Sequence, residues 1–247
     1  MNPFRLDGKT ILITGASSGI GRTIALQCSY QGANLIITGR NSTRLQQTYK
    51  ELSGDGHQMI TANLNDEEDL NFIIEQIPKL DGLVCNAGMV DPLLLQFIEK
   101  IDVDNTLNTN AISVIHLVRL LVQHKKLKKE SSIVLTSSIN GNKCAYIGSS
   151  IYAASKAMLT GFMKASALEL ASKGIRVNTI EPGMIETELL SNSAISIEEL
   201  EKDKMKYPLK RYGKPEEVAF AAIYLLSDAT KWMTGTQLLI DGGYTLQ

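Results

Sequence analysis

Two polar residues, Tyr152 and Lys156, lie four positions apart in the segment YAASK and could perform acid–base chemistry together. In a helix this spacing places both side chains on one face, one turn apart. A phenol has an unperturbed pKa of about 10, so it exchanges protons poorly near neutral pH. A lysine ammonium about 5 Å away favours the phenolate by roughly 3 kcal/mol at an effective dielectric near 20. We therefore expect the pKa of Tyr152 to fall by roughly two units, giving a usable general acid or base.

The same pair has a plainer interpretation, in which a surface tyrosine and a solvated lysine share an ordinary helix. A tyrosine four residues before a lysine occurs by chance in many proteins. The elements that position the pair must therefore decide between the two interpretations.

Composition narrows the class of protein. The chain has 247 residues, of which 44% are hydrophobic, as expected for a folded globular protein. Its net charge of −1 gives no electrostatic reason to expect nucleic-acid binding, and no run of about 18 apolar residues predicts a membrane span. The 3 cysteines are scattered and the 3 histidines lack metal-ligand spacing, so neither disulfides nor a metal site is expected. Without a signal-peptide pattern at its start, the sequence predicts a soluble, cytoplasmic protein.

A glycine-rich turn between a strand and a helix predicts a dinucleotide-binding loop. Residues 9–14 (KTILIT) are apolar and β-branched, as in a strand buried on both faces, and helical periodicity begins at Arg22. Glycines between them would let the backbone turn tightly and approach a pyrophosphate at the helix amino end. Any tight strand-to-helix turn can use glycines, and a P-loop is excluded because no Gly-Lys-Ser/Thr follows. The candidate cofactor ligands here are Gly15, Ser17, Ser18, Gly19, Ile20 and Gly21.

The end of the next predicted strand, residues 34–38, bears on the choice of cofactor. An acid about 20 residues beyond the glycines commonly binds the ribose 2′-hydroxyl, whereas an arginine accommodates a 2′-phosphate. No acid lies between Thr38 and Arg44, and Arg40 follows the strand. The sequence therefore favours NADP(H) over NAD(H). Alternatively, Arg40 and Arg44 are solvated charges at the start of a helix.

Strands and helices alternate along the rest of the chain at the spacing of βαβ units. Further strands are expected at residues 58–61, 81–85, 131–136, 174–180 and 236–240. No linker or repeat divides the chain, so it predicts one domain over residues 1–247. The fold class is α/β, a doubly wound (Rossmann) domain whose mainly parallel sheet of about seven strands is flanked by helices. Within it, residues 184–210 are expected to include a mobile helical lid over the site.

Three further segments place polar or small residues where a ligand could meet them. Asn110 lies inside a long helix predicted over residues 98–124, where an asparagine either bonds locally or has a specific polar partner. Ser138 follows a strand, at the edge where open α/β sheets bind ligands. Residues 86–88 (NAG) follow another strand and would either let the backbone approach a nicotinamide ribose or form a bare turn.

Taken together in this order, the motifs resemble the short-chain dehydrogenase/reductase family over nearly the whole chain. Residues 14–21 (TGASSGIG) are similar to its cofactor loop, and Tyr152 with Lys156 to its YxxxK pair. Ser138, followed at the S-x-x-G spacing by Gly141, resembles its catalytic serine. The other matching segments are Asn86-Ala87-Gly88, Asn110, and Pro182-Gly183 with Thr187.

The resemblance implies transfer of a hydride between a nicotinamide cofactor and a carbonyl or secondary alcohol. In reduction Tyr152 would be the general acid, assisted by Lys156 and by the positive charge of an oxidised nicotinamide. Ser138 would bond the substrate oxygen, Lys156 would also hold the nicotinamide ribose, and Asn110 would position a water that links Lys156 to solvent. The implied catalytic set is Asn110, Ser138, Tyr152 and Lys156. The implied cofactor set adds Arg40, Asn63, Leu64, Asn86, Ala87, Gly88, Tyr152, Lys156, Pro182, Gly183, Ile185 and Thr187 to the glycine loop.

Two positions depart from the family pattern. Asn63 stands where members commonly carry an aspartate that accepts a hydrogen bond from the adenine amine. An amide oxygen can still accept that bond, so adenine binding would be weakened at most. Cys85 replaces the first asparagine of a frequent NNAG motif, with an expected effect on packing only. Ser137 is a rival to Ser138, and the S-x-x-G spacing favours Ser138.

Features near the carboxyl end bear on the substrate. Residues 208–218 (PLKRYGKPEEV) and 241–243 (DGG) resemble 3-oxoacyl-acyl-carrier-protein reductases, although many sugar, polyol and steroid dehydrogenases share them. The leading hypothesis is NADPH-dependent reduction of a 3-oxoacyl thioester in fatty acid biosynthesis. The alternative is a dehydrogenase of sugars, polyols or other small alcohols. A non-catalytic, cofactor-sensing protein is a third hypothesis, which the complete catalytic set disfavours.

Partners are predicted from charge and from the resemblance. The run Lys125–Lys129 is basic; such runs are usually solvated helix ends, and this one could instead contact an acidic carrier protein together with Lys173. The resemblance also implies homotetramers, with helices 98–124 and 152–173 packing between subunits. The expected substrate is a small-molecule or carrier-linked carbonyl, and no contact with nucleic acid or membrane is expected.

Overall fold

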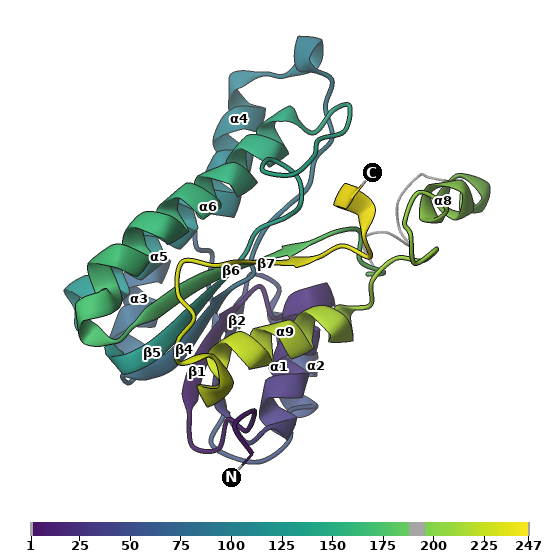
Figure 1. The fold of residues 1–247 in the computed structure, drawn as a ribbon. Helices are drawn as coiled ribbons and strands as arrows, with labels where there is room; N and C mark the ends of the chain where they lie inside the picture. Colours follow the sequence, from purple (N-terminus) through teal and green to yellow (C-terminus); the bar gives the residue numbers. More distant parts are fainter. Residues whose placement is uncertain (1, 188–195, 247) are drawn as a thin grey trace.

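Seven apolar segments form one parallel sheet in the computed structural model, which describes residues 2–187 and 196–246 (Figure 1). The strands are β1 (Thr10–Thr14), β2 (Asn34–Gly39), β3 (Gln58–Thr61), β4 (Leu80–Cys85), β5 (Leu127–Thr136), β6 (Arg176–Pro182) and β7 (Gln237–Ile240). The α-helices are α1 (Gly19–Tyr30), α2 (Ser42–Lys50), α3 (Glu67–Gln76), α4 (Lys100–Leu107), α5 (Ser113–Gln123), α6 (Ser150–Leu170), α8 (Ile197–Lys204) and α9 (Pro215–Leu226). None of the helices in these two ranges is long and apolar enough to cross a membrane.

The strand order, β3-β2-β1-β4-β5-β6-β7, makes the sheet doubly wound. The chain moves outward from β1 to β3, returns to place β4 beside β1, and then moves outward on the other side. The carboxyl ends of β1 and β4 therefore flank the point where the winding reverses, which is where such sheets bind ligands. The predicted fold class is confirmed.

Helices cover both faces of the sheet, so its strands are apolar on both sides. In Figure 1, α1, α2 and α9 lie on one face, and α3, α5 and α6 lie on the other. Within β1, Ile11 and Ile13 belong to the core under α1 and α9, whereas Leu12 belongs to the core under α5 and α6. This double burial explains why the strand reads as a continuous apolar run rather than an alternating one.

The long helix predicted over residues 98–124 is present over 100–123, with a π-helical turn in its middle that the sequence did not predict. The structure has α4, then a π-helical turn at Asn108–Ile112, then α5. The turn carries Asn110, whose side chain leaves the helix to bond the backbone of Met89. Single π-turns inside helices are rare and often lie at functional sites.

Only the start of the basic run is a helix end, because Lys125 follows the C-cap residue of α5 whereas the last part of the run is a strand. β5 begins at Leu127, because its first residue pairs with Leu80 of β4, so Lys128 and Lys129 belong to the strand. Lys128 forms an ion pair with Asp81 at 2.7 Å. The run therefore lies at the amino edge of the sheet, opposite the edge at which the predicted site residues gather.

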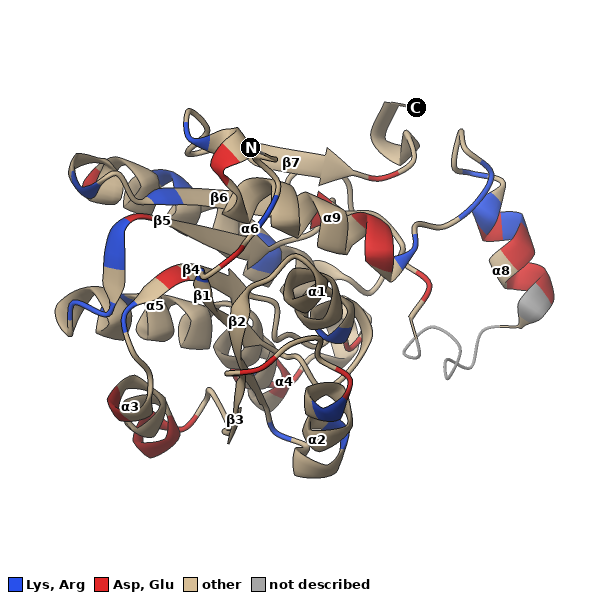
Figure 2. Cartoon of the chain, turned by 90° about the horizontal axis from the view of Figure 1, so that it is seen from below, with Lys and Arg blue, Asp and Glu red and all other residues tan. Residues whose placement is uncertain are grey.

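The predicted lid is only partly within the described residues, because 188–195 lie outside them. Helix α8 is present and stands at the margin of the molecule, with acidic and basic side chains along it (Figure 2). Its amino end is fixed by a capping box between Ser196 and Glu199. Its flanks are bonded to each other, since the amide of Gly213 donates to the Met184 carbonyl at 3.0 Å. They are also bonded to the segment that follows β7, since the amide of Leu209 donates to the Gly242 carbonyl at 3.3 Å. Motion of α8 stays a prediction.

Candidate active site

The glycine loop after β1 and the turn after β4 are locked together. The hydroxyl oxygen of Thr14 accepts from the amides of Asn86 at 3.1 Å and Ala87 at 3.2 Å. A Cβ on Gly15, which has φ +67°, would lie 2.7 Å from the Ala87 Cα. A Cβ on Gly21 would overlap the carbonyl oxygen of Gly15. Glycine is required at both positions because backbone meets backbone there.

The start of α1 fits a pyrophosphate. Ser18 is the N-cap residue and its side chain makes no capping hydrogen bond, so the first-turn amides keep their hydrogens for an external acceptor. A helix amino end with free amides favours a phosphate group. Together with the close approach of backbone at Gly15 and Gly21, this loop fits the dinucleotide that the sequence predicts.

The ends of β2 and β3 lie beside the loop and carry the residues predicted for the adenosine half. A Cβ on Gly39 would lie 3.2 Å from the Ser17 hydroxyl, so the loop touches the end of β2. Arg40 follows, exposed, and no carboxylate in the described parts of the chain pairs with it. A 2′-phosphate placed at this end could therefore bind Arg40 without displacing an existing partner.

Asn63 and Leu64 follow β3, next to Arg40 in space because Gly39 pairs with Thr61. The Asn63 amide oxygen accepts from the backbone N–H of Asn65 at 3.3 Å. One lone pair of that oxygen is thus still available for an adenine amine, while Leu64 is buried beneath. The geometry is compatible with the prediction that Asn63 accepts from the adenine amine in place of an aspartate.

Asn110 fixes the turn after β4. Its side-chain oxygen accepts from the Met89 amide at 2.7 Å, and its side-chain nitrogen donates to the Met89 carbonyl at 2.9 Å and to the Ser155 hydroxyl at 3.0 Å. A Cβ on Gly88 would lie 3.3 Å from the Asn110 oxygen. Both donors of the amide are used, so the side chain has only one lone pair left for the predicted water.

Lys156 is 5% exposed and lies beside this turn. Its Nζ donates to the Thr136 carbonyl at 2.9 Å, and a Cβ on Gly88 would lie 3.5 Å from it. Burial lowers the pKa of Lys156 to about 8, so the ammonium form still predominates at neutral pH. An ammonium has three donors, and in the described part of the chain only one is engaged.

Tyr152 does not show the predicted fall in pKa. Burial raises the pKa of Tyr152 to about 12, the hydrogen bond with the Ser138 hydroxyl opposes that rise, and Tyr146 adds to it. The Lys156 nitrogen lies over the Tyr152 ring, 5.7 Å from its centroid, and bonds elsewhere. The prediction is wrong for the protein alone because loss of hydration is the largest cause of the shift and the Lys156 charge is not among its causes. The phenol is therefore protonated at neutral pH and can donate.

The two candidate serines have different surroundings. Ser138 is buried, acts to lower the pKa of the Tyr152 phenol, and accepts from the Asn140 amide at 3.1 Å. The Ser137 hydroxyl instead donates to the Lys156 carbonyl at 2.9 Å, which ties β5 to α6. The structure thus places Ser138, and not Ser137, against the tyrosine, as the S-x-x-G spacing predicts.

Residues 182–187 cross from the end of β6 to the glycine loop. The Pro182 carbonyl accepts from the Ile139 amide at 3.1 Å. At the other end, the Thr187 methyl group is 3.5 Å from where a Cβ on Gly19 would be. The segment therefore spans the space between the Ser138 strand end and the loop that fits the pyrophosphate.

Two backbone amides in this segment, those of Ile185 and Thr187, have no acceptor among the described residues. The amides of Gly183, Met184 and Glu186 donate to β7, to the Tyr207 phenol and to the Gly213 carbonyl, respectively. Of the two free donors, the Ile185 amide, near the predicted nicotinamide, fits a carboxamide oxygen.

The sequence did not indicate three residues that hold the site together. Met89, Ser155 and Tyr207 each make a hydrogen bond to a residue of the predicted set or to its immediate neighbour. They carry no local signal, because their partners are far away in the sequence.

The sheet, the glycine loop after β1 and the Ser138–Tyr152–Lys156 group define a dinucleotide-binding domain. Its acid–base site lies where the winding of the sheet reverses. A family model described as Enoyl-(Acyl carrier protein) reductase matches residues 15–245. The 3-oxoacyl-[acyl-carrier-protein] reductase FabG of Rickettsia conorii is 36% identical over 241 residues, covering 96% of this chain and 97% of that protein. Its Thermotoga maritima counterpart is 35% identical over 251 residues, covering 98% and 100%.

A solved structure agrees with these sequence matches. A short-chain type dehydrogenase/reductase from Mycobacterium marinum has a TM-score of 0.89 at 33% identity, covering 100% of this chain and 99% of that one. The chain belongs to the short-chain dehydrogenase/reductase family. It is an NAD(P)-dependent oxidoreductase, and the predicted family is confirmed.

Proposed function

We propose that this protein reduces the 3-oxo group of an acyl thioester with NADPH, on the pattern of its 3-oxoacyl-acyl-carrier-protein reductase relatives. The observation that carries the proposal is that the Ser138 hydroxyl and the Lys156 ammonium both lie beside the protonated Tyr152 phenol, the hydroxyl lowering its pKa and the ammonium 5.7 Å from its ring centroid. Relatives named for this activity match over nearly the full length of the chain. The site can orient a carbonyl and give its oxygen a proton.

The proposed roles follow from what each side chain can donate. The nicotinamide of the bound cofactor supplies the hydride. Ser138 donates a hydrogen bond to the substrate carbonyl oxygen and so stabilises the negative charge that develops there. Tyr152 gives its phenolic proton to that oxygen as general acid. The unused donors of Lys156 bind the nicotinamide ribose, and its charge stabilises the phenolate that Tyr152 becomes.

The proposed cofactor ligands divide into three groups. The first-turn amides of α1 bind the pyrophosphate, and Arg40 binds the 2′-phosphate, which makes the cofactor NADP(H) rather than NAD(H). Asn63 accepts from the adenine amine. The Ile185 amide donates to the nicotinamide carboxamide, between Pro182 and Thr187. The small residues of the turn at 86–88 let the nicotinamide ribose come close to the backbone there.

Apolar side chains near the mouth of the site support a substrate with a hydrocarbon chain. The amide of Leu93 donates to the Gly148 carbonyl at 3.0 Å, which brings the segment before α4 beside the loop that leads to Tyr152. On these two segments Ile147 is 86% exposed and Leu95 is 77% exposed, and Phe97 is exposed as well. Exposed apolar groups beside a polar site mark a surface that binds apolar material, which favours an acyl chain over a sugar.

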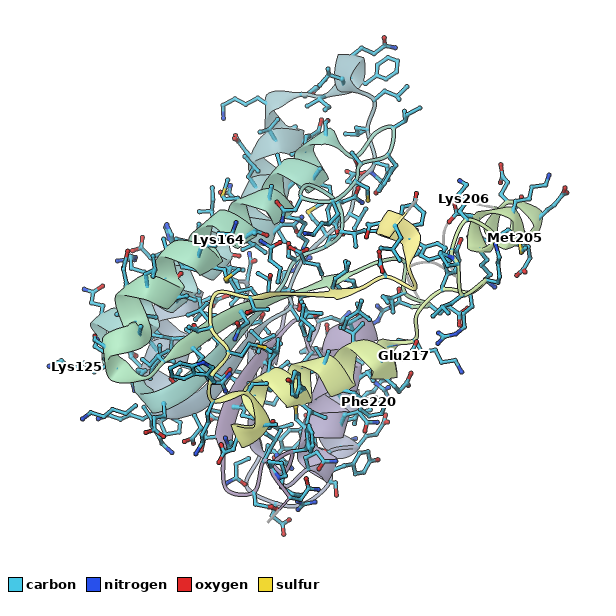
Figure 3. All side chains as sticks on the ribbon, viewed as in Figure 1. Lys125, Lys164, Met205, Lys206, Glu217 and Phe220 are labelled. Carbon is cyan, nitrogen blue, oxygen red and sulfur yellow. The ribbon has the colours of Figure 1, made fainter. Side chains whose placement is uncertain are left out.

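The proposal includes a homotetramer, supported by two separate apolar surfaces. On α6, Leu168 is exposed and a Cβ on Gly161 would meet nothing. Near α9, Phe220 and Trp232 are exposed, and Figure 3 shows Phe220 on the outer side of that helix. Two different self-complementary surfaces on each subunit generate a tetramer with dihedral symmetry.

The basic run, residues 125–129, lies far from the proposed entrance to the active site. Lys125 lies at the end of the molecule opposite α8 (Figure 3). The part of α6 from Tyr152 to its end at Leu170 is about 27 Å long, and it runs from the level of Tyr152 toward that edge. A carrier docked on residues 125–129 would therefore be far from Tyr152 of the same chain.

The test is NADPH oxidation, followed by absorbance, with a short 3-oxoacyl thioester as substrate and NADH in a parallel reaction. We expect rapid turnover that prefers NADPH. Turnover of sugars or polyols but not of the thioester would replace the proposed substrate with the alternative one. Tight NADPH binding without turnover of any carbonyl would instead indicate a cofactor-sensing protein.

A further inference from the structure

Three tyrosines that were not predicted as site residues form a cluster beside residues 182–187. The Tyr207 ring packs edge-on against Tyr212, with centroids 5.5 Å apart, and lies 4.8 Å from the centroid of Tyr244. Tyr207 and Tyr212 are buried. Tyr207 follows α8 and Tyr244 follows β7, so the cluster joins two chain segments at the carboxyl edge of the sheet.

Tyr207 contacts the predicted nicotinamide segment in two ways. Its phenol oxygen accepts from the Met184 amide at 3.1 Å. Its ring lies 3.4 Å from where a Cβ on Gly183 would be and 3.5 Å from the same point on Gly242. The ring is therefore seated between two glycines, with its hydroxyl directed at one particular amide.

That amide belongs to the peptide immediately before the one that carries the free Ile185 donor. The Gly183 and Glu186 amides are held by backbone carbonyls, so Tyr207 provides the only side-chain support for an amide between them in this described segment. The orientation of one peptide constrains the next, because two torsions separate them. The Ile185 amide shares its peptide plane with the Met184 carbonyl, which accepts from the Gly213 amide at 3.0 Å. The Tyr207 phenol and the Gly213 amide therefore hold the two peptides on either side of the Met184 Cα. Without the phenol, the Ile185 amide is supported from one side only.

We propose that Tyr207 is a positioning residue that aims the Ile185 amide at the nicotinamide carboxamide. The inference rests on the proposed cofactor site and adds to it a residue outside every motif. Tyr207 acts through the Met184 backbone and does not itself touch the reacting atoms. Its effect is confined to the nicotinamide end of the cofactor, because Arg40 and the start of α1 lie on other elements.

Tyr212 provides a matched control from the same cluster. Its phenol donates to the Asp203 carboxylate at 2.9 Å and to the Leu200 carbonyl at 3.3 Å, both in α8. No hydrogen bond joins its side chain to residues 182–187 within the described chain. Removing its hydroxyl costs the fold a comparable bond without loosening the Met184 amide.

The experiment compares Tyr207→Phe with Tyr212→Phe by calorimetric titration with two ligands. NADPH carries the nicotinamide, and 2′,5′-ADP carries only the adenosine phosphates. For Tyr207→Phe we expect Kd for NADPH to rise about fivefold, the size expected for one hydrogen bond, with Kd for 2′,5′-ADP unchanged. For Tyr212→Phe both constants should stay within twofold of the unmodified protein. Thermal melting without ligand, and titration at a temperature where each variant is folded, separate binding from stability.

Four other outcomes would overturn the proposal. An unchanged Kd for NADPH in Tyr207→Phe would show that the phenol does not support the site. Equal losses for NADPH and 2′,5′-ADP would indicate a general structural role, as would equal losses in both variants. If the unmodified protein binds 2′,5′-ADP but gains nothing from the nicotinamide, the proposed cofactor site itself fails, and Tyr207 loses its role with it.

Discussion

Two buried cations, one at each edge of the sheet, are satisfied to different degrees. Lys156 lies at the carboxyl edge and is 5% exposed; Arg176 lies at the amino edge and is 7% exposed. In the described ranges neither forms a salt bridge with a carboxylate. Burying a charge is unfavourable unless hydrogen bonds replace its water, so the number of bonds each cation makes is informative.

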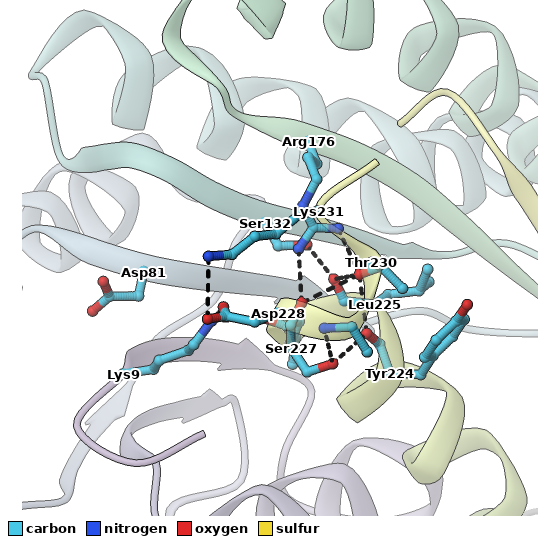
Figure 4. Close-up of polar contacts among 12 residues, drawn as sticks. Lys9, Asp81, Ser132, Arg176, Tyr224, Leu225, Ser227, Asp228, Thr230 and Lys231 are labelled. Carbon is cyan, nitrogen blue, oxygen red and sulfur yellow. Dashed lines mark hydrogen bonds and ion pairs between the residues drawn. The ribbon is translucent and has the colours of Figure 1, made fainter. Parts of the chain in front are cut away.

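Arg176 is held by the loop between α9 and β7 (Figure 4). Its guanidinium donates to the Thr230 hydroxyl at 2.8 Å, to the Ser227 carbonyl at 3.3 Å and to the Met233 carbonyl at 3.5 Å. Burial lowers the pKa of Arg176, and nearby Asp228 opposes that fall. Asp228 is itself paired with Lys9 at 2.6 Å.

Lys156, by contrast, makes one hydrogen bond, to Thr136. Its remaining donors lie beside Gly88, in the space proposed for the cofactor ribose. The difference teaches that burial alone does not identify a functional charge. A cation with several protein acceptors stabilises the fold, whereas one with donors to spare is prepared for a ligand.

The largest expected effect tests whether the carboxyl edge performs the chemistry at all. Tyr152→Phe removes the proposed proton donor, and we expect kcat/KM to fall about 10³-fold while Kd for NADPH stays within twofold. Tyr224→Phe changes a tyrosine at the amino edge and should leave turnover unchanged. Equal activity of the two variants would remove Tyr152 from the mechanism.

Exchanging each cation for methionine tests the comparison directly. Arg176→Met leaves several acceptors without a donor, so we expect urea denaturation to show a loss of about 4 kcal/mol in unfolding free energy. Its turnover per folded molecule should be unchanged. Lys156→Met should lower turnover about 100-fold without lowering the unfolding free energy at pH 7. Reversed results for the two variants would show that the count of hydrogen bonds misassigns their roles.

The pH dependence of stability sharpens the comparison. Burial lowers the pKa of Lys156 from 10.5 to about 8, so between these values the unfolded chain binds more protons than the folded one. Unfolding free energy should therefore gain a contribution that rises with pH, by about 3 kcal/mol in total at 1.36 kcal/mol per unit. Denaturation of the unmodified protein and Lys156→Met at pH 7.5 and 10 measures it. Parallel behaviour of the two proteins would mean that the lysine is not destabilised by burial.

A third cation extends the comparison to an exposed site. Arg40 is exposed, and its expected ligand is the 2′-phosphate of the cofactor. Because Arg40 is surrounded by solvent, Arg40→Asp should leave the melting temperature unchanged. We expect the preference for NADPH over NADH, taken as a ratio of kcat/KM values, to narrow about tenfold or to reverse. Arg44→Asp, a neighbouring exposed arginine, should change it much less. Equal use of both cofactors by the unmodified protein would contradict the role given to Arg40.

The sequence was sufficient for most of the fold because its signals are local. Each strand is a short apolar segment buried on both faces, and each helix between strands has its own periodicity. The start of β5 was missed because pairing with β4 extends the strand through Lys128 and Lys129, whose polarity suggests a surface turn. There, sheet register outweighs composition.

For the site, the motifs gave the reacting groups but not their environment. The π-turn at Asn110 depends on Met89, 21 residues away, and the support of Met184 depends on Tyr207, 23 residues away. The pKa of Tyr152 depends on how much water the packing removes, which spacing along a helix does not record. Long-range contacts and desolvation were therefore the parts that required the structure.

Helix α1 packs against α9, so folding of the nascent chain depends on its last third (Figure 1). Ile24 and Cys28 of α1 share one core with Val218 and Ala222 of α9, nearly two hundred positions later. During synthesis the helix that follows the glycine loop thus remains without its partner until α9 has left the ribosome. Chains that stop early expose this apolar surface and are open to aggregation and proteolysis. The glycine loop that precedes α1 is therefore held in place only once α9 has been synthesised.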